Sequence, residues 1–262
     1  EELDFDDNGE EIKVKGQTKH IKESTTDPES GLYHKGEHEK CFAYSHQTFC
    51  DKNNFVLVSV TVPGNVHDSV SFYPAYEELN ETYGEKIKNV CLDAGYNVSH
   101  ICRRIYENGQ QPVMPYHRPM GSQNKVKKKD FEYNEELDCY ICPQGDVLSY
   151  VTTNREGYRQ YRCKNCEGCP LKEKCTKQKQ KSLYIHIWED YRKQADEYRH
   201  TDQWKKIYPL RKETIERVFG DAKEKHGMRY TNYRGLAKVT AETALRFACM
   251  NLKKLAKWKK KM

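Results

Sequence analysis

The order of β-type and helical segments in the first half of the chain constrains its fold most. Two β-type runs flank a polar turn and predict a β-hairpin: 41–49 alternates apolar with polar residues, and 55–62 is more densely apolar and β-branched. Further along, the hydrophobic spacing predicts a helix, a buried strand, a second helix and a second strand, at 71–83, 89–92, 99–108 and 113–115. This order is typical of an α/β fold in which helices cover a mixed sheet.

The composition agrees with a folded protein in contact with water. Hydrophobic residues make up 36% and aromatic residues 11% of the 262 positions, which is enough for a buried core, and the net charge is +6. No apolar run reaches the roughly 18 residues of a membrane span, and no secretory signal opens the chain. We therefore expect a cytoplasmic protein with no membrane partner. The absence of an initiator Met and the acidic, polar start predict an N-terminally truncated piece.

The second half of the chain changes in character. A basic stretch over 121–129 leads into a Cys-rich segment, and helical periodicity returns over 188–200, 211–225 and 237–258. In the last of these helices one apolar stripe is expected to pack on the sheet; it consists of Ala241, Ala244, Leu245, Ala248, Leu252 and Leu255. The predicted organisation is a polar segment (1–38), the first part of the core (39–118), a basic linker with a Cys-rich insertion (119–181), and the second part of the core with a basic tail (182–262).

Two acidic residues are candidates for catalysis. Asp93 directly follows a buried strand, at the sheet edge where α/β proteins bind ligands, although an Asx turn is the commoner explanation. Glu216 lies in an amphipathic run with Lys212 four residues before it and Lys223 seven after it. One continuous helix would place all three on one face. On one interpretation, this face is a solvated row of ion pairs. On the other, the Glu216 carboxylate binds a metal ion while the two lysines bind phosphates.

These residues resemble the motifs of a known family, the DDE transposases of bacterial insertion sequences (IS4-like superfamily). Residues 92–96 match the motif of the family's second catalytic Asp, and Tyr208, Arg211, Glu216 and Lys223 match its Tyr-Arg-Glu-Lys signature. Four residues, where the family has three, separate Arg211 from Glu216, so that Lys212 occupies the expected basic position. Further similarity lies at 25–28, 63–69 and 233–236, in the family's order.

The resemblance implies a fold and a reaction. The fold is an RNase H-like mixed sheet flanked by helices, with a small zinc-ribbon-like insertion. The reaction is metal-dependent cleavage and strand transfer of phosphodiester bonds at insertion-sequence ends. Asp93 and Glu216 would hold Mg²⁺ or Mn²⁺, while Tyr208, Arg211, Lys212 and Lys223 would contact DNA phosphates. The implied partners are double-stranded DNA, both transposon ends and target, and a second copy in a homodimer on the nucleoid.

The resemblance also exposes one departure. The family carries its first catalytic Asp on a strand before the hairpin, and no β-type run with an Asp precedes residue 41. We therefore expect that strand and its Asp to be missing, since Asp51 and Asp68 fall at turn positions. The alternative function is a non-catalytic, zinc-containing DNA-binding remnant of a transposase. An RNase H-like nuclease unrelated to transposition is disfavoured by the Tyr208–Lys223 signature.

Six of the 11 cysteines lie between positions 139 and 175; five of them are in Cys-x-x-Cys spacing, and Cys175 follows. This spacing predicts one structural Zn²⁺, and the alternative is a set of free thiols. Four of six candidates would bind the ion: Cys139, Cys142, Cys163, Cys166, Cys169 and Cys175. The resemblance favours Cys142, Cys166, Cys169 and Cys175. The tail holds six lysines that would attract a phosphate backbone or simply be solvated; they are Lys253, Lys254, Lys257, Lys259, Lys260 and Lys261.

Overall fold

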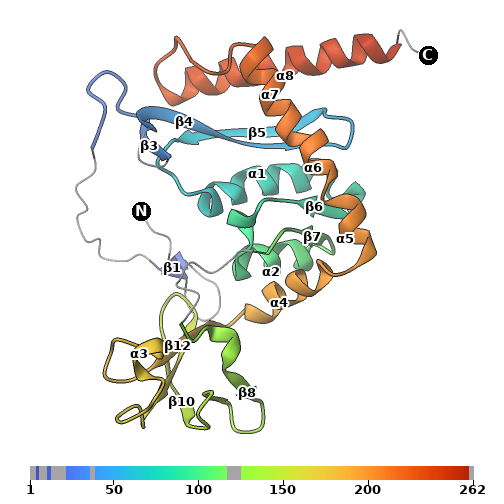
Figure 1. Cartoon of the computed structure of the whole chain (residues 1–262). Coiled ribbons are helices and arrows are strands. Elements are labelled where there is room, and N and C mark those ends of the chain that lie inside the picture. Colours follow the sequence, from blue (N-terminus) through green and yellow to red (C-terminus); the bar gives the residue numbers. More distant parts are fainter. Residues whose placement is uncertain (1–3, 6–10, 13–21, 36–38, 117–124, 260–262) are drawn as a thin grey trace. The chain divides into compact units, whose positions relative to one another are not determined.

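The computed structural model describes residues 4–5, 11–12, 22–35, 39–116 and 125–259. The chain divides into two compact units: unit 1 comprises 1–18 and 118–190, and unit 2 comprises 19–117 and 191–262. The expected insertion, 119–181, falls within the second range of unit 1. The predicted mixed α/β architecture is confirmed (Figure 1). Lys260 and Lys261 of the expected basic tail lie outside the described residues.

Unit 2 begins with an antiparallel sheet of three strands, β3 (Gly31–Lys35), β4 (Glu39–Cys50) and β5 (Val56–Pro63). The predicted β4–β5 hairpin is confirmed, and its turn is closed by Asp51. That carboxylate accepts hydrogen bonds from the backbone N–H groups of Asn53 (2.9 Å) and Phe55 (2.8 Å). Asn54 adopts a positive φ of 68°, a conformation that Asn tolerates better than most residues.

Strands β3 and β5 pair with successive parts of the same edge of β4. Gly31 lies opposite Ala43, while the N–H of Gly64, directly after β5, donates to the carbonyl of Ala43 at 2.8 Å. A Cβ added to Gly31 would collide with Asn65. Strands on opposite edges of β4 would be roughly 9 to 10 Å apart, so this contact requires a shared edge. Within the described residues, no strand pairs with the second edge of β4.

A parallel pair of short strands, β6 (Asn89–Cys91) and β7 (Gln111–Val113), forms the second ladder of unit 2. Helix α2 (Ser99–Glu107) connects them, with the 3₁₀ turn η2 (Ala94–Tyr96) before it. Helix α1 (Asp68–Tyr83) and the 3₁₀ turn η1 (Gly84–Lys86) precede β6. β7 starts two residues before the predicted strand because its register with β6 places Gln111 opposite Asn89. One core joins these elements; its largest side chains include Phe72, Tyr76, Ile101, Ile105 and Met114.

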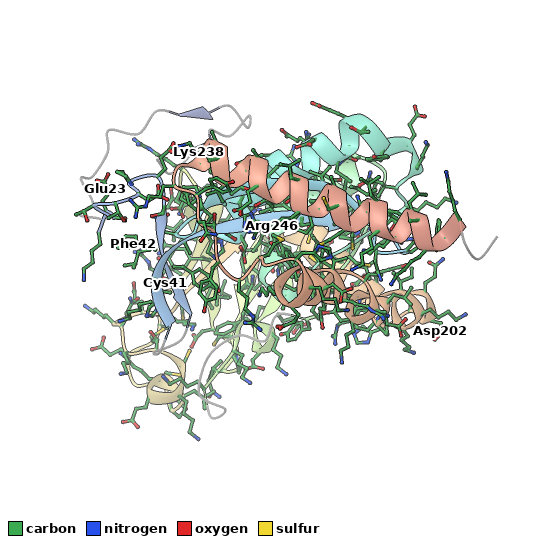
Figure 2. The ribbon with its side chains drawn as sticks, turned by 90° about the horizontal axis from the view of Figure 1, so that it is seen from above. Glu23, Cys41, Phe42, Asp202, Lys238 and Arg246 are labelled. Atoms are coloured by element: carbon green, nitrogen blue, oxygen red, sulfur yellow. The ribbon has the colours of Figure 1, made fainter. Side chains whose placement is uncertain are left out.

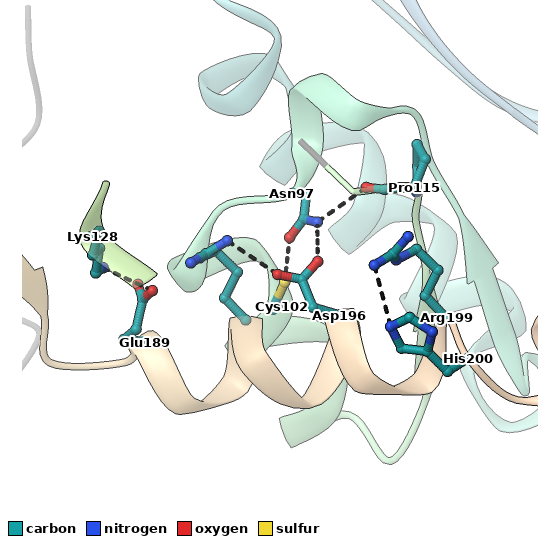
Figure 3. Close-up of polar contacts among 9 residues, drawn as sticks. Asn97, Cys102, Pro115, Lys128, Glu189, Asp196, Arg199 and His200 are labelled. Atoms are coloured by element: carbon teal, nitrogen blue, oxygen red, sulfur yellow. Dashed lines mark hydrogen bonds and ion pairs between the residues drawn. The ribbon is translucent and has the colours of Figure 1, made fainter. Parts of the chain in front are cut away.

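The helices after the insertion return to unit 2. They are α4 (Glu189–Tyr198), α5 (Asp202–Ile207), α6 (Leu210–Glu213), α7 (Ile215–Lys225) and α8 (Leu236–Lys259). The buried amide of Asn97 anchors α4, because its Nδ2 donates both to Asp196 Oδ1 (3.0 Å) and to the Pro115 carbonyl (3.1 Å), as Figure 3 shows. Since Asn97 follows η2, this anchor fixes the segment that carries Asp93.

The predicted continuous helix over 211–225 is wrong. It breaks at Thr214, whose φ of −109° and ψ of −97° belong to neither α6 nor α7. Thr214 Oγ1 donates to the Leu210 carbonyl at 2.8 Å and so satisfies the end of α6. Lys212 therefore lies on α6, and its predicted alignment with Glu216 on one helix face fails. Lys223 and Glu216 do share α7.

The apolar stripe predicted to bury α8 also proves wrong. All six of its residues are exposed, with Leu245 at 67% and Leu252 at 64%, whereas Val239, Thr243, Phe247 and Met250 are buried. Helix α8 lies across the β4–β5 sheet, as seen from above in Figure 2. Both faces of its middle part are apolar, so hydrophobic spacing alone could not indicate which face packs.

Hydrogen bonds connect helix α8 to the first part of unit 2 (19–117) at two places, the start of the helix and Asn251. The Asp27 carboxylate accepts from the Gly235 N–H (3.1 Å), and Glu29 accepts from the Leu236 N–H (2.9 Å), so together they cap the start of the helix. Asn251 exchanges two hydrogen bonds with the backbone of Val56, at 2.9 and 2.8 Å. The motif at 25–28 and the turn before α8 are therefore parts of one structural contact.

Unit 1 contains an antiparallel five-stranded sheet in the order β12-β11-β10-β9-β8. Its strands are β8 (Glu132–Asn134), β9 (Cys139–Ile141), β10 (Val147–Thr153), β11 (Tyr158–Cys163) and β12 (Ser182–His186). The 3₁₀ turn η3 (Lys128–Asp130), helix α3 (Lys172–Cys175) and a separate ladder of β1 (Asp4–Phe5) with β2 (Glu11–Ile12) complete it. Leu148 and Tyr161 are buried at the centre of its core. Lys128 and Glu189 form an ion pair at 2.9 Å (Figure 3).

Candidate functional site

Asp93 lies at the carboxyl end of β6, where the chain turns into η2. Its Oδ1 accepts the N–H of Gly95 at 2.9 Å, so the Asx turn that the sequence allowed is present. The side chain is still 44% exposed, and its Oδ2 faces Arg211. The turn therefore engages Oδ1 of Asp93, and Oδ2 can interact with a cation.

Glu216 lies in the first turn of α7, directly after the break at Thr214. Its side chain is 50% exposed. The N-terminus of a helix carries partial positive charge, which stabilises a carboxylate there without a fixed partner.

One guanidinium connects the two acids. Arg211 Nη2 lies 3.6 Å from Asp93 Oδ2, and Arg211 Nη1 lies 3.2 Å from Glu216 Oε1. Because both nitrogens belong to one planar group, the two carboxylates lie within about 10 Å of each other. The structure thus brings together Asp93, Arg211 and Glu216. Lys212 contacts neither acid in the described structure and is exposed, so Arg211, not Lys212, supplies the basic group beside Glu216.

Tyr208 lies next to Arg211, and Trp204 stacks on Tyr208. The two rings stack with centroids 4.7 Å apart and an interplanar angle of 10°, and Trp204 Nε1 donates to the Met114 carbonyl at 3.0 Å. Burial raises the pKa of the Tyr208 hydroxyl; the charges of Asp93 and Glu216 act in the same direction, while Arg211 opposes them. Tyr208 therefore belongs to the same electrostatic neighbourhood as both acids. Trp204 was missed in the sequence, where only its spacing of four residues from Tyr208 could have indicated it.

The other acids of unit 2 that the sequence raised have different partners. Asp27 caps α8 and accepts the Tyr44 hydroxyl, and Asp51 closes the hairpin turn. Asp68 accepts an amide N–H of Gln47 at 3.0 Å. Gln47 in turn accepts the Tyr96 hydroxyl at 2.6 Å. Gln47 was also missed: it is a buried polar residue within β4, and its place in the alternating strand gave no signal of this contact.

The two carboxylates fit one hard divalent cation. Mg²⁺ and Mn²⁺ take oxygen ligands, commonly one or two carboxylates completed by water, and half-exposed acids that share one positive charge meet that need. Across the described residues, no three His, Cys, Asp or Glu side chains form a metal-binding group. Lys223, in the last turn of α7, is exposed and available to an anion.

A second candidate site is the cysteine cluster of unit 1. Five cysteines line a cavity of about 30 Å³, room for about one water molecule or ion: Cys142, Cys163, Cys166, Cys169 and Cys175. Burial raises the pKa of Cys175; Lys181 opposes this, and the thiols of Cys166, Cys169 and Cys142 raise the pKa further. Cys175 therefore lies close to those three thiols.

Cys142, Cys166 and Cys169 lie in tight turns after strands β9 and β11, and Cys175 ends helix α3. Gly145 follows Cys142 with a φ of +85°, and Gly168 lies between Cys166 and Cys169 with a φ of +74°. These positive φ angles suit glycine and fold each Cys-x-x-Cys-type segment into a knuckle. The N–H of Lys181 points at Cys166 Sγ, at 3.4 Å. This is the polarity expected at a sulfur that carries negative charge.

The remaining two cysteines of the segment are packed in the sheet. Cys139 on β9 is 4% exposed and does not line the cavity, whereas Cys163 at the end of β11 is 2% exposed and does line it. Burial raises the pKa of Cys163 to about 12, and its hydrogen bond with Cys166 adds to this. Cys139 therefore behaves as a small core residue, while Cys163 borders the other thiols of the cavity.

Comparison with known proteins gives one match. Residues 141–256 match the family model described as Transposase DDE domain, which supports a DDE transposase. The matched range includes Arg211, Glu216 and Lys223, and it starts after Asp93. No curated protein and no solved structure matches the chain. No helix in the described ranges has the length and apolar character to cross a membrane.

Proposed function

We propose that this chain is a catalytic domain of the DNA transposase class, with an RNase H-like core; enzymes of this class cut and join phosphodiester bonds at the ends of an insertion sequence. The observation that carries the proposal is the contact of one guanidinium with Asp93 and Glu216, which come from distant parts of the sequence. The match to the transposase DDE domain supports the same reaction. DNA on the bacterial nucleoid, in the cytoplasm, would be the substrate.

In this proposal Asp93 and Glu216 hold Mg²⁺ or Mn²⁺. The bound ion would activate a water or a 3′-hydroxyl and stabilise the leaving oxygen. Lys223 lies on the same helix as Glu216, seven residues further on, and would bind a phosphate of the DNA end. Tyr208, Arg211 and Lys212 would contact neighbouring phosphates.

The alternative, a non-catalytic DNA-binding remnant, is favoured by a separate observation. Two-metal phosphoryl transfer needs acids that offset the repulsion between two ions about 4 Å apart. Asp27, Asp51 and Asp68 are bonded elsewhere, and among the described residues no third acid joins Asp93 and Glu216. We therefore propose that this chain binds DNA and cleaves it poorly.

Cleavage and binding assays distinguish the two functions. We expect the chain to bind a supercoiled plasmid with an affinity that falls as salt rises, and Lys223→Gln to weaken that binding. With Mn²⁺, nicking should not exceed that of Asp93→Asn. Robust nicking that Asp93→Asn and Glu216→Gln both abolish would establish the enzyme and reject the remnant. Robust nicking that both variants retain would reject the assigned site.

We further propose that unit 1 binds one structural Zn²⁺ through Cys142, Cys166, Cys169 and Cys175. The shared cavity and the two glycine turns support this set; Cys139 lies outside the cavity, and Cys163, which also lines it, is the alternative fourth ligand. Metal analysis should find about one zinc per chain. Cys166→Ser and Cys175→Ser should lose it, while Cys139→Ser should keep it. Equal zinc content in all three variants would contradict this ligand set.

A homodimer on DNA is also part of the proposal, because joining two transposon ends requires two active sites. Sedimentation of the chain with and without a duplex tests it: a dimer that forms only with DNA is expected, and a monomer in both conditions would contradict it.

A further inference from the structure

We infer that Arg211 couples metal binding to DNA binding: its guanidinium occupies the place between Asp93 and Glu216 until a DNA phosphate draws it away. This inference rests on the proposed function of that site. It starts from the two ion pairs, at 3.6 and 3.2 Å, in which one cation serves two acids.

The surroundings hold Arg211 in this position. Its side chain is only 22% exposed, less than either acid. Tyr208 borders it and is fixed by stacking on Trp204, which is in turn bonded to the backbone at Met114. The break at Thr214 then turns the chain so that Glu216 faces the same guanidinium. The surrounding structure therefore positions Arg211 between both acids.

Electrostatics makes the guanidinium and a divalent ion competitors. Two carboxylates this close repel each other, and the single positive charge of Arg211 offsets that repulsion. A divalent ion between the same acids does so with twice the charge, but then the guanidinium and the ion repel each other. Metal binding therefore requires Arg211 to move away from the acids.

DNA supplies a second partner for the displaced group. A guanidinium binds phosphate oxygens in a bidentate manner, so a phosphate near the site would hold Arg211 in its displaced position. Each ligand then removes part of the cost of binding the other. By linkage, DNA must tighten metal binding by the same factor as metal tightens DNA binding.

Mn²⁺ affinity measured by electron paramagnetic resonance tests this coupling without any catalytic readout. The full chain would be titrated with Mn²⁺, alone and with a 30-base-pair duplex of random sequence, as wild type, Arg211→Gln, Lys206→Gln and Asp93→Asn. Lys206 on α5 is the matched control, since it is a nearby exposed cation with no part in the proposed site. Circular dichroism would verify that each variant is folded.

We expect Arg211→Gln to tighten Mn²⁺ binding at least threefold in the absence of DNA. The duplex should tighten binding by a similar factor in wild type and in Lys206→Gln, and by less than twofold in Arg211→Gln. Arg211→Lys, which keeps the charge, should retain part of the coupling. A purely structural role would weaken Mn²⁺ binding in both Arg211 variants.

The outcome separates two failures. Unchanged or weaker Mn²⁺ binding by Arg211→Gln, or equal tightening by the duplex in all variants, would overturn the inference while Asp93→Asn still loses the ion. Mn²⁺ binding that Asp93→Asn leaves intact would overturn the proposed metal site itself.

Discussion

Arg211 and Thr214 show how a local irregularity can preserve a site. The extra residue between Arg211 and Glu216 would rotate Glu216 away from Arg211 on a straight helix, because each residue adds about 100°. The break at Thr214 removes that constraint, and the two side chains meet at 3.2 Å. The motif indicated which residue types belong to the site, whereas the helix break depends on backbone geometry that the sequence pattern did not reveal.

Asp27 offers a test of a structural acid. Replacing it with Ala removes the acceptor for the Gly235 N–H and for the Tyr44 hydroxyl. We expect the free energy of unfolding to fall by about 1–2 kcal/mol, as for other lost helix caps. Urea denaturation would measure the change, with Glu23→Ala as an exposed control. An unaltered midpoint for Asp27→Ala would show that the cap contributes nothing.

His46 predicts a loss of stability in mild acid. Burial lowers its pKa to about 4, and the charge of Arg246 acts in the same direction, whereas Glu242 opposes both. Thr61 Oγ1 lies 3.1 Å from the His46 Nδ1. Because the folded pKa lies below the unfolded value, the unfolded chain binds the proton first as pH falls. Stability is therefore complete above about pH 6.5 and falls between that pH and about pH 4.

The test compares unfolding of wild type and His46→Gln by urea at pH 7, 5 and 4. We expect wild type to lose about 1 kcal/mol per pH unit more than the variant over this range. Parallel pH profiles for the two proteins would show that His46 is accessible to protons in the folded state.

At the level of elements, hydrophobic spacing located most helices and strands but not all of their contacts. The β4–β5 hairpin, α1, α2 and α8 appear near their predicted positions, because alternation and helical period reflect local burial. Pairing partners are set by distant residues: nothing near Gly31 indicates that β3 and β5 share one edge of β4, and α8 buries the face opposite the predicted one. The cysteine spacing, in contrast, marks a segment that lies within one compact unit of the structure.

Substitutions on the two faces of α8 test which face packs. Phe247→Ala should lower the free energy of unfolding by about 3 kcal/mol or more, because it opens a cavity in the core. Leu245→Ser and Leu252→Ser should change it by less than about 0.5 kcal/mol, since both side chains are mostly exposed. Thermal or urea denaturation of the three variants would decide. The reverse order of effects would restore the face that the spacing predicted.

At the level of the whole molecule, the two units have separate cores. Leu148 and Tyr161 belong to the core of unit 1, while Phe72 and Tyr76 belong to that of unit 2. If a bound zinc ion stabilises the fold of unit 1, removal of the zinc should destabilise that unit alone. The sequence predicted two regions from composition and cysteine spacing; the assignment of α8 and of the 25–28 motif to one contact required the three-dimensional structure.

Hydrogen exchange with and without a zinc chelator measures this selectivity. We expect chelation to accelerate exchange of amides in β10 and β11, which flank the cysteine turns, and to leave α8 unchanged. Acceleration in both regions would show that the two units unfold together, and no acceleration in either would contradict the zinc site.

The interruption of unit 2 by unit 1 has a consequence for synthesis on the ribosome. Strands β3 to β5 leave the exit tunnel early, yet their partners Gly235 and Asn251 belong to the last part of the chain. Unit 1, from 118 onward, is almost contiguous and is completed first. The sheet face that α8 covers is therefore exposed on the nascent chain until its 24 residues emerge. In this interval the protein depends on chaperones more than a protein with contiguous domains of the same size.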